Sequence, residues 1–342
     1  MIDEKYYAFD KTNVVESDFW TNNLYNMAYD RVKDRKYPLI IPSYNRPNNN
    51  MIKYIYENVD PSEPWDIRFL VRKSQKEAYE ANEYFQKCDF VTTLALEDEL
   101  INDIGKVREQ AVNYFMDKSQ CIFMMDDDVT GLFYTVPFMR ASGAKISLEV
   151  GPKIAKRNFA RVLAMWQVAM EESIKIHNSL IISCPMIAGF SWAEKYCDSD
   201  ISLKFISGAQ VCCLCINVDN CKKYDVNFRT GKGNGHEDKD FVIRAIQKGC
   251  MTAEYRWLAY NCETMGTELL NTAVKDRMAQ QYDEMYANFS DVDFIRWVDG
   301  DRNGFKNVRI NWNKAMKYYN DFTGENITKD TNKNNLAEIL GL

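Results

Sequence analysis

Short apolar runs alternate with amphipathic stretches between residues 38 and 125. Four of the apolar runs predict strands, at 38–43, 66–72, 89–96 and 121–125. Between them, apolar residues at helical spacing predict helices over 51–59, 74–86 and 103–117. Ser74 and Glu77 match a capping box, which predicts the start of the second helix. This alternation predicts a mostly parallel sheet with helices on its faces.

The pattern changes after residue 150. A long helix is predicted from Pro152, with an apolar stripe of Phe159, Val162, Leu163, Trp166 and Met170. The runs 180–192 and 208–217 predict strands of a mixed sheet. Later elements are predicted as a helix over 238–248 that Gly249 ends, a helix over 267–288, and a strand over 307–313 before a final helix.

Composition excludes several classes of protein. Apolar residues make up 46% and charged residues 27% of the 342 residues, which excludes global disorder. The formal net charge of −6 argues against a strongly basic nucleic-acid coat, although a local basic groove stays open. The chain has neither an apolar signal core nor an apolar run of the roughly 18–20 residues that span a bilayer. We therefore expect a soluble cytoplasmic protein without a membrane partner.

The ten cysteines lack the spacing of a zinc motif. Cys212, Cys213 and Cys215 fall in one apolar run, which predicts small buried residues. Free thiols in this number indicate a reducing compartment.

Three consecutive aspartates, Asp126, Asp127 and Asp128, directly follow the apolar run 121–125. Open α/β sheets bind ligands at the carboxyl ends of their strands. Alternate residues of an extended chain face the same side, so Asp126 and Asp128 are expected to face one side together. Mg²⁺ and Mn²⁺ take oxygen ligands and keep substrate phosphates as further ligands. The triplet predicts a metal site for a diphosphate; without the preceding strand, a solvated acidic turn would be the better interpretation.

A second acidic pair, Glu237 and Asp238, lies where a Gly-rich segment meets the predicted helix 238–248. Acids at this position commonly cap a helix and complement its dipole, and one of the pair is expected to do only that. The other is a candidate general base facing an acceptor hydroxyl. For the pair alone, capping is the better interpretation; the upstream triplet strengthens the interpretation as a general base.

Polar residues also follow the first two predicted strands. The motif IIPSYNRP places Ser43, Asn45 and Arg46 after the first strand, and Arg72 ends the second. Arg108 lies early in the helix that precedes the aspartates. Because parallel strands end at one edge of the sheet, these residues are candidates to contact a base, a ribose or phosphates.

Taken together, PSYNRP, IGKVREQAV, the aspartate triplet and GHEDKDF resemble the motifs of GT-A glycosyltransferases. The resemblance covers residues 37–260 and implies an α/β fold, a Rossmann-like mixed sheet flanked by helices with a nucleotide-sugar site at the carboxyl edge of its strands. FLVRKSQKEAY and MMDDDV are most similar to the TET-associated glycosyltransferases, found largely in phages. That similarity implies sugar transfer to 5-hydroxymethylpyrimidines in DNA, in the cytoplasm of a phage host.

The resemblance also implies a division of the chain. An N-terminal extension covers 1–36, and a C-terminal extension of helix and strand covers 266–342. The catalytic domain covers 37–265, with a nucleotide-binding half at 37–130 and an acceptor half at 131–265.

Carried over by position, the family's nucleotide pocket would be lined by Pro42, Ser43, Asn45 and Arg46. Arg72 and Arg108 would hold base or phosphate, and Asp126 and Asp127 would contact ribose or sugar. Asp128, with Asp126, would bind the metal, Mn²⁺ or Mg²⁺. Glu237 and Asp238 would lie at the acceptor side, one as the base of an inverting enzyme. Two further residues are assigned loosely to the sugar, Gln210 and Asn217.

The third metal ligand is left open. GT-A enzymes commonly supply a histidine after the acidic motif, whereas this chain has only His177 and His236, neither of them in that position. His236 is a substitute ligand on this interpretation, or a structural or acceptor-contacting residue.

The implied reaction is metal-dependent transfer from a nucleoside diphosphate sugar, expected to be a UDP-sugar, to a hydroxyl. Phosphates of a DNA acceptor would meet basic residues that are otherwise solvated: Arg140, Lys145, Lys153, Lys156, Arg157, Arg302, Lys306 and Arg309. The alternatives are a GT-A enzyme acting on a polysaccharide, lipid or protein, and a non-catalytic nucleotide-sugar-binding protein. A nucleotidyltransferase is less well matched, because PSYNRP is not a Gly-rich basic loop.

Overall fold

The computed structural model describes residues 26–134, 159–185, 203–207, 212–229, 236–262, 272–300, 306–328, 331 and 333–334. Several predictions lie outside these residues: those for 1–25, 186–192, 208–211 with Gln210, 267–271, Pro152 and the basic residues Arg140, Lys145, Lys153, Lys156, Arg157 and Arg302.

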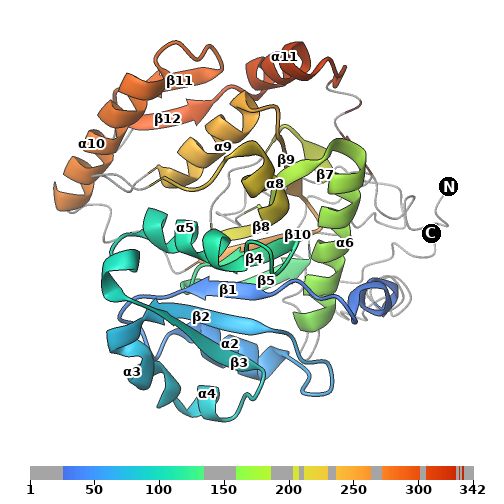
Figure 1. The fold of residues 1–342 in the computed structure, drawn as a ribbon, viewed down its shortest axis with the longest axis vertical. Coiled ribbons are helices and arrows are strands. Elements are labelled where there is room, and N and C mark those ends of the chain that lie inside the picture. The colour runs from blue at the N-terminus through green and yellow to red at the C-terminus, as the bar shows by residue number, and fades with distance from the viewer. Residues whose placement is uncertain are drawn as a thin grey trace, which may run out of the picture.

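A nine-stranded mixed sheet forms the centre of the molecule (Figure 1). From one edge to the other its strands are β13 (Lys333–Asn334), β7 (Leu203–Phe205), β9 (Met251–Tyr255), β6 (Ser179–Ser183), β8 (Cys213–Asn217), β4 (Cys121–Met125), β1 (Leu39–Pro42), β2 (Ile67–Arg72) and β3 (Val91–Leu96). The four strands from β4 to β3 are parallel. Strand β8 runs antiparallel between β4 and β6, which makes the sheet mixed, as predicted.

Strand β4 shows why the sheet is buried on both faces. All five of its residues are buried, and alternate side chains enter two separate apolar clusters. Phe123 packs on Trp166 of helix α6 (Phe159–His177), with ring centroids 4.8 Å apart. Ile122 and Met124 enter the cluster that includes Phe115 of helix α5 (Ile104–Phe115). The predicted stripe of α6 is wholly buried in the first cluster.

Shorter helices complete the layers around the sheet. They are α2 (Asn50–Asn58), α8 (Val218–Tyr224) and α9 (Glu237–Gln247), of which α9 ends before Gly249 at φ 71°. The predicted C-terminal stop of that helix is therefore confirmed. A seven-residue helix at 26–32 buries Ala28 and Val32 in the core, so this part of the predicted N-terminal extension packs against the sheet layers.

Two small antiparallel sheets are separate from the large one in their hydrogen bonding. Strand β5 (Val129–Tyr134) pairs with β10 (Leu258–Cys262), and β11 (Ile295–Val298) pairs with β12 (Asn307–Ile310). Helices α10 (Thr272–Phe289) and α11 (Trp312–Thr323) belong to this later part of the chain. The strand and helix predicted from residue 307 are confirmed, whereas β5, β7, β9, β10, β11 and α8 were not predicted.

The predicted helix 74–86 is wrong as one continuous element. It is divided into the 3₁₀ turn η2 (Lys73–Gln75), α3 (Lys76–Glu80) and α4 (Glu83–Gln86). Ser74 does not cap a helix, because its hydroxyl donates to Asp98 at 2.5 Å. Asn82 instead accepts from the N–H of Tyr84 and begins a new helix. Likewise, the strand predicted over 180–192 ends at Ser183.

Among the described residues, none of the helices combines the length and apolar character needed to cross a bilayer. The nine cysteines that lie in these residues are all free and buried.

Candidate active site

The carboxyl ends of β1, β2 and β4 border a cleft of about 320 Å³. Parallel strands end at the same edge of a sheet, so residues that follow them gather there. The cleft is lined by Pro42, Ser43, Tyr44, Arg46, Leu70, Arg72, Ile101, Asn102, Asp103, Ile104, Val107, Asp126, Asp127 and Asp128. The structure thus brings together most of the residues predicted to bind the nucleotide. Asn45, at φ 56°, lies in an adjoining hollow with Arg46 and Asp127.

Asp127 is bound to the loop that follows β1. Its carboxylate accepts a hydrogen bond from Ser43 Oγ at 2.5 Å and from Arg46 Nη1 at 3.3 Å. Tyr79 Oη lies 2.6 Å from Ser43 Oγ and accepts from the N–H of Arg46 at 3.0 Å. Burial raises the pKa of Asp127, although the hydrogen bond from Ser43 and the charge of Arg46 oppose this. These contacts fix the conformation of the PSYNRP loop at the cleft.

Asp126 lines the cleft and pairs with Arg108. Arg108 Nη2 lies 3.1 Å from both carboxylate oxygens of Asp126, and Arg108 Nη1 donates to Glu237 at 2.7 Å. The Arg108 side chain is only 3% exposed. Burial opposes its charge, but the neighbouring carboxylates of Asp126 and Glu237 raise its pKa above the usual value. Arg108 therefore joins the two acidic motifs, an environment different from the predicted contact with base or phosphate.

Glu237 and Asp238 lie in the first turn of α9, and both are buried. Burial raises the pKa of Glu237 to about 7, against the opposing charge of Arg108. Because the Glu237 carboxylate is held by Arg108, Asp238 is the better candidate to meet an acceptor. His236 precedes them without capping the helix through its side chain. Burial lowers the pKa of His236 to about 3, so its ring is neutral near pH 7.

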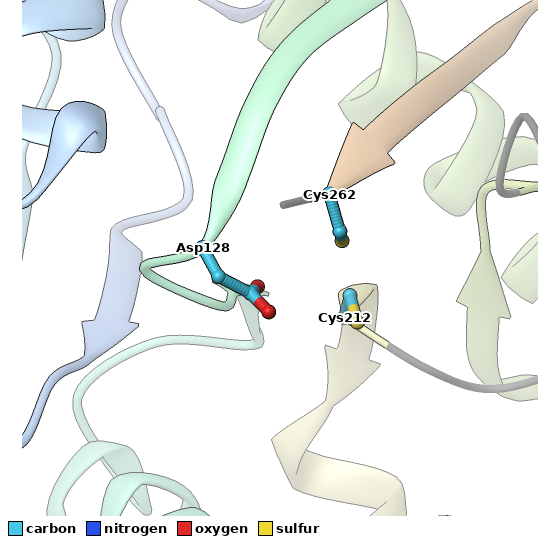
Figure 2. A group of neighbouring side chains, drawn as sticks. All are labelled: Asp128, Cys212 and Cys262. Carbon is cyan, nitrogen blue, oxygen red and sulfur yellow. The ribbon is translucent and has the colours of Figure 1, made fainter. Parts of the chain in front are cut away.

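Asp128 has different neighbours from the other two aspartates (Figure 2). Its carboxylate points toward the thiols of Cys212 and Cys262, and the three ligand atoms lie within 4.8 Å of one another. Within the part of the chain that the structure describes, Asp128 Oδ1 is buried without a hydrogen-bond partner. The two aspartates predicted to bind a metal thus have different neighbours, since Asp126 pairs with Arg108 and Asp128 lies beside two thiols.

Asn217, which was expected to face the sugar, and His177, one of the two histidines, make structural contacts. Asn217 caps α8, since its side chain accepts from the N–H of Asn220 and donates to the carbonyl of Ser179 at 3.3 Å. His177 lies at the end of α6, where Nδ1 contacts Glu325 at 2.9 Å. Neither residue lines the cleft.

Sequence reasoning missed part of the cleft wall. Tyr44 is 58% exposed, and the guanidinium of Arg72 lies 4.2 Å from its ring centroid. The opposite lining comes from residues 101–107, at the start of α5. Tyr44 lies in the same motif as Ser43 and Arg46. An aromatic residue in a loop near Arg46 and Arg72 could have predicted a stacking surface in the cleft.

Comparisons with known proteins gave the following results. No protein-family model and no curated protein matches the sequence. Among solved structures, S. aureus TarS 1–349 in complex with UDP-GlcNAc matches at 11% identity with a TM-score of 0.42, over 73% of this chain and 66% of that one. For a longer TarS chain, the match spans 40% of its length.

Two phosphoglycerate synthases match over more of their length. Mannosyl-3-phosphoglycerate synthase from Rubrobacter xylanophilus has 9% identity and a TM-score of 0.47, over 90% of this chain and 94% of that one. Glucosyl-3-phosphoglycerate synthase from Mycobacterium tuberculosis, in complex with Mn²⁺, UDP and phosphoglyceric acid, has 8% identity and a TM-score of 0.46, over 84% and 90%.

Proposed function

We propose that this chain is a GT-A type glycosyltransferase, and that the cleft at the ends of β1, β2 and β4 binds a nucleoside diphosphate sugar. The observation that carries the proposal is the convergence of Arg46, Arg72 and the aspartate triplet on one cleft at a sheet edge. Open α/β sheets bind nucleotides at this location. Arginine guanidinium groups match the geometry and charge of phosphates.

The two ends of the cleft suit different parts of such a donor. Tyr44, with Arg72 over its ring, offers an exposed aromatic face to a nucleobase. Arg46 lies on the PSYNRP loop and pairs with Asp127 at 3.3 Å; its side chain is half exposed, so its remaining N–H groups can meet a diphosphate or ribose. A divalent cation bound at Asp128 would neutralise charge on the leaving diphosphate. Uridine is the expected base.

Asp238 is proposed as the general base that takes the proton of the acceptor hydroxyl, which makes the transfer inverting. Two observations support this choice. Glu237 already accepts a hydrogen bond from Arg108, and Asp238 is the next acid in the first turn of α9. Glu237 and Arg108 then act as positioning residues that link α9 to Asp126. A base in hydrogen-bonding reach of the acceptor contributes roughly 10²–10⁴-fold to rate.

For the acceptor we propose a 5-hydroxymethylpyrimidine in DNA, supported by the similarity of FLVRKSQKEAY and MMDDDV to the TET-associated enzymes. A protein with net charge −6 would need a local basic surface to approach DNA. Among the described basic candidates, Lys306 is paired with Asp283 at 2.7 Å, whereas the Arg309 side chain is exposed on β12.

The test is sugar transfer. The protein is incubated with Zn²⁺, Mn²⁺ or Mg²⁺, a panel of UDP- and GDP-sugars, and DNA that contains 5-hydroxymethylcytosine or 5-hydroxymethyluracil. Mass spectrometry of the digested nucleosides should show an added sugar mass. Asp238→Asn should abolish this product. Asp66→Asn should retain it, because Asp66 precedes β2 at the end of the strand away from the cleft. Hydrolysis of the donor without a DNA product would discard this acceptor and keep the enzyme. Absence of both would contradict the proposal and favour a non-catalytic binding protein.

A further inference from the structure

Three side chains from distant parts of the sequence converge behind the cleft. Asp128 immediately precedes β5, Cys212 precedes β8, and Cys262 ends β10. The antiparallel pairing of β5 with β10 places Cys262 opposite Val129, directly beside Asp128. The N–H of Asp126 donates to the carbonyl of Cys212 at 2.8 Å, which attaches Cys212 to the aspartate triplet. Figure 2 shows the three side chains pointing toward one another.

The arrangement has the dimensions of a metal site. All three ligand atoms lie within 4.8 Å of one another. A tetrahedral Zn²⁺ with bonds of about 2.3 Å to sulfur and about 2.1 Å to oxygen holds its ligand atoms roughly 3.5–3.8 Å apart. The observed separations therefore exceed those of a bound Zn²⁺ by at most about 1.3 Å.

The chemistry of the ligands distinguishes between metals. Mg²⁺ and Mn²⁺ prefer oxygen, but the other two aspartates are engaged, Asp126 by Arg108 and Asp127 by Ser43 and Arg46. What remains is one carboxylate, whose buried Oδ1 has no partner among the described residues, and two thiols that are 3% and 8% exposed. Thiolate ligands favour Zn²⁺ over hard cations.

We propose that Asp128, Cys212 and Cys262 form a three-ligand site for a thiophilic divalent cation, Zn²⁺ first among them. Three protein ligands leave a fourth position for water or substrate, as in zinc sites that take part in reactions. Asp128 lines the cleft, whereas the two cysteines do not, so a cation here would be reached from the cleft side. The inference deepens the proposed function by naming its metal, but metal binding is measured without any sugar donor.

Cobalt substitution tests the site directly. The full-length protein is reduced with a phosphine, freed of metal with a chelator, and titrated with Co²⁺. We expect one equivalent to produce the near-ultraviolet thiolate-to-cobalt absorption and the visible bands of tetrahedral Co²⁺. Zn²⁺ should displace the Co²⁺ with an affinity higher by about 10-fold or more. A large excess of Mg²⁺ should not displace it.

Variants assign the ligands. Cys212→Ser and Cys262→Ser should each weaken the thiolate band, and the double variant should abolish it. Asp128→Asn should weaken Co²⁺ binding by about 10-fold or more while keeping the band. The matched control is Cys121→Ala with Cys215→Ala, which removes two buried thiols of the neighbouring strands β4 and β8 that do not belong to the proposed site. Circular dichroism and urea unfolding verify that each variant is folded; if a serine variant is not, Cys262→Ala replaces it.

Two results would overturn the proposal. One is the absence of a thiolate band in the folded, reduced wild-type protein. The other is a band that survives in the folded double variant of Cys212 and Cys262. Donor binding in the presence of Mg²⁺, measured separately, distinguishes failure of this site from failure of the proposed function, because either can be positive without the other.

Discussion

Arg108 is the residue on which the geometry of the candidate site depends most. It connects Asp126, 18 positions later in the chain, with Glu237, 129 positions later. The guanidinium is almost fully buried, so both carboxylates compensate a charge that has been removed from water. The sequence did not predict that Arg108 joins the two acidic motifs. An arginine early in a helix at the ligand-binding edge of the sheet could as well contact a ligand.

Removal of this guanidinium is expected to be strongly destabilising. Arg108→Ala leaves Asp126 and Glu237 near each other without a counter-charge, and should lower the free energy of unfolding by about 3–5 kcal/mol. Urea denaturation measures the change. The control is Arg68→Ala, because Arg68 forms an exposed pair with Asp66 at 2.8 Å and such pairs contribute about 0–1 kcal/mol. Equal, small effects of the two substitutions would contradict the bridging role.

Glu237 gives stability a specific pH dependence. Its pKa in the folded protein, about 7, lies above the usual 4.5. The folded state therefore holds the proton more tightly, and this contribution is complete below pH 4.5 and lost as pH rises through 7. Between pH 5 and pH 8, we expect the free energy of unfolding to fall by about 3 kcal/mol less in Glu237→Gln than in the wild-type protein. Urea denaturation across this range measures it, and parallel profiles would refute the raised pKa.

At the scale of elements, Gly105 explains how α5 and α9 come together. A methyl group at this position would collide with the carbonyl oxygen of Arg229. Phe228 beside it stacks on Phe241 of α9, with ring centroids 4.2 Å apart. The glycine thus allows the segment that ends at Arg229 to lie against α5 and helps to place the helix that carries Glu237.

Gly105→Ala tests this close approach by the sign of its effect. Alanine is the better helix former by about 1 kcal/mol, so without a collision the variant would be more stable. Overpacking against backbone costs about 1–3 kcal/mol and should make it less stable instead. Gly300→Ala, where nothing lies within 4 Å, should change stability by less than about 0.5 kcal/mol. Thermal unfolding measures both, and a stabilised Gly105→Ala would exclude the collision.

The sequence predicted the parallel half of the sheet because its signals are local. Strands β1 and β4 are wholly buried and β2 largely so, whereas the edge strand β3 buries only Val91 and Leu94. The intervening spacing of apolar residues produces α2 and α5. The capping box predicted at Ser74 was wrong because the Ser74 hydroxyl donates to Asp98, which is distant in the sequence, and does not cap the helix backbone. Strands β5 and β10 were not predicted, because they form by pairing between segments more than a hundred residues apart and local apolar patterns do not show such pairing.

At the scale of the whole molecule, one part of the candidate site could be predicted from the sequence and another could not. The cleft residues that follow β1, β2 and β4 were predictable, since parallel strands end at one edge. The group of Asp128, Cys212 and Cys262 was not, because its members come together only through the pairing of β4 with β8 and of β5 with β10. Cysteine spacing along the chain carries no trace of it.

Calorimetric titration of the protein with nucleoside diphosphate sugars tests the proposed donor site most directly. We expect one binding site, weakened by about 10-fold or more in Arg46→Ala and in Arg72→Ala, since each substitution removes a hydrogen bond to a charged group worth about 1.5–3 kcal/mol. Arg68→Ala, whose side chain on β2 pairs with Asp66, should bind as the wild type does. Binding that both cleft variants leave unchanged, or no binding across UDP- and GDP-sugars, would contradict a donor site in this cleft.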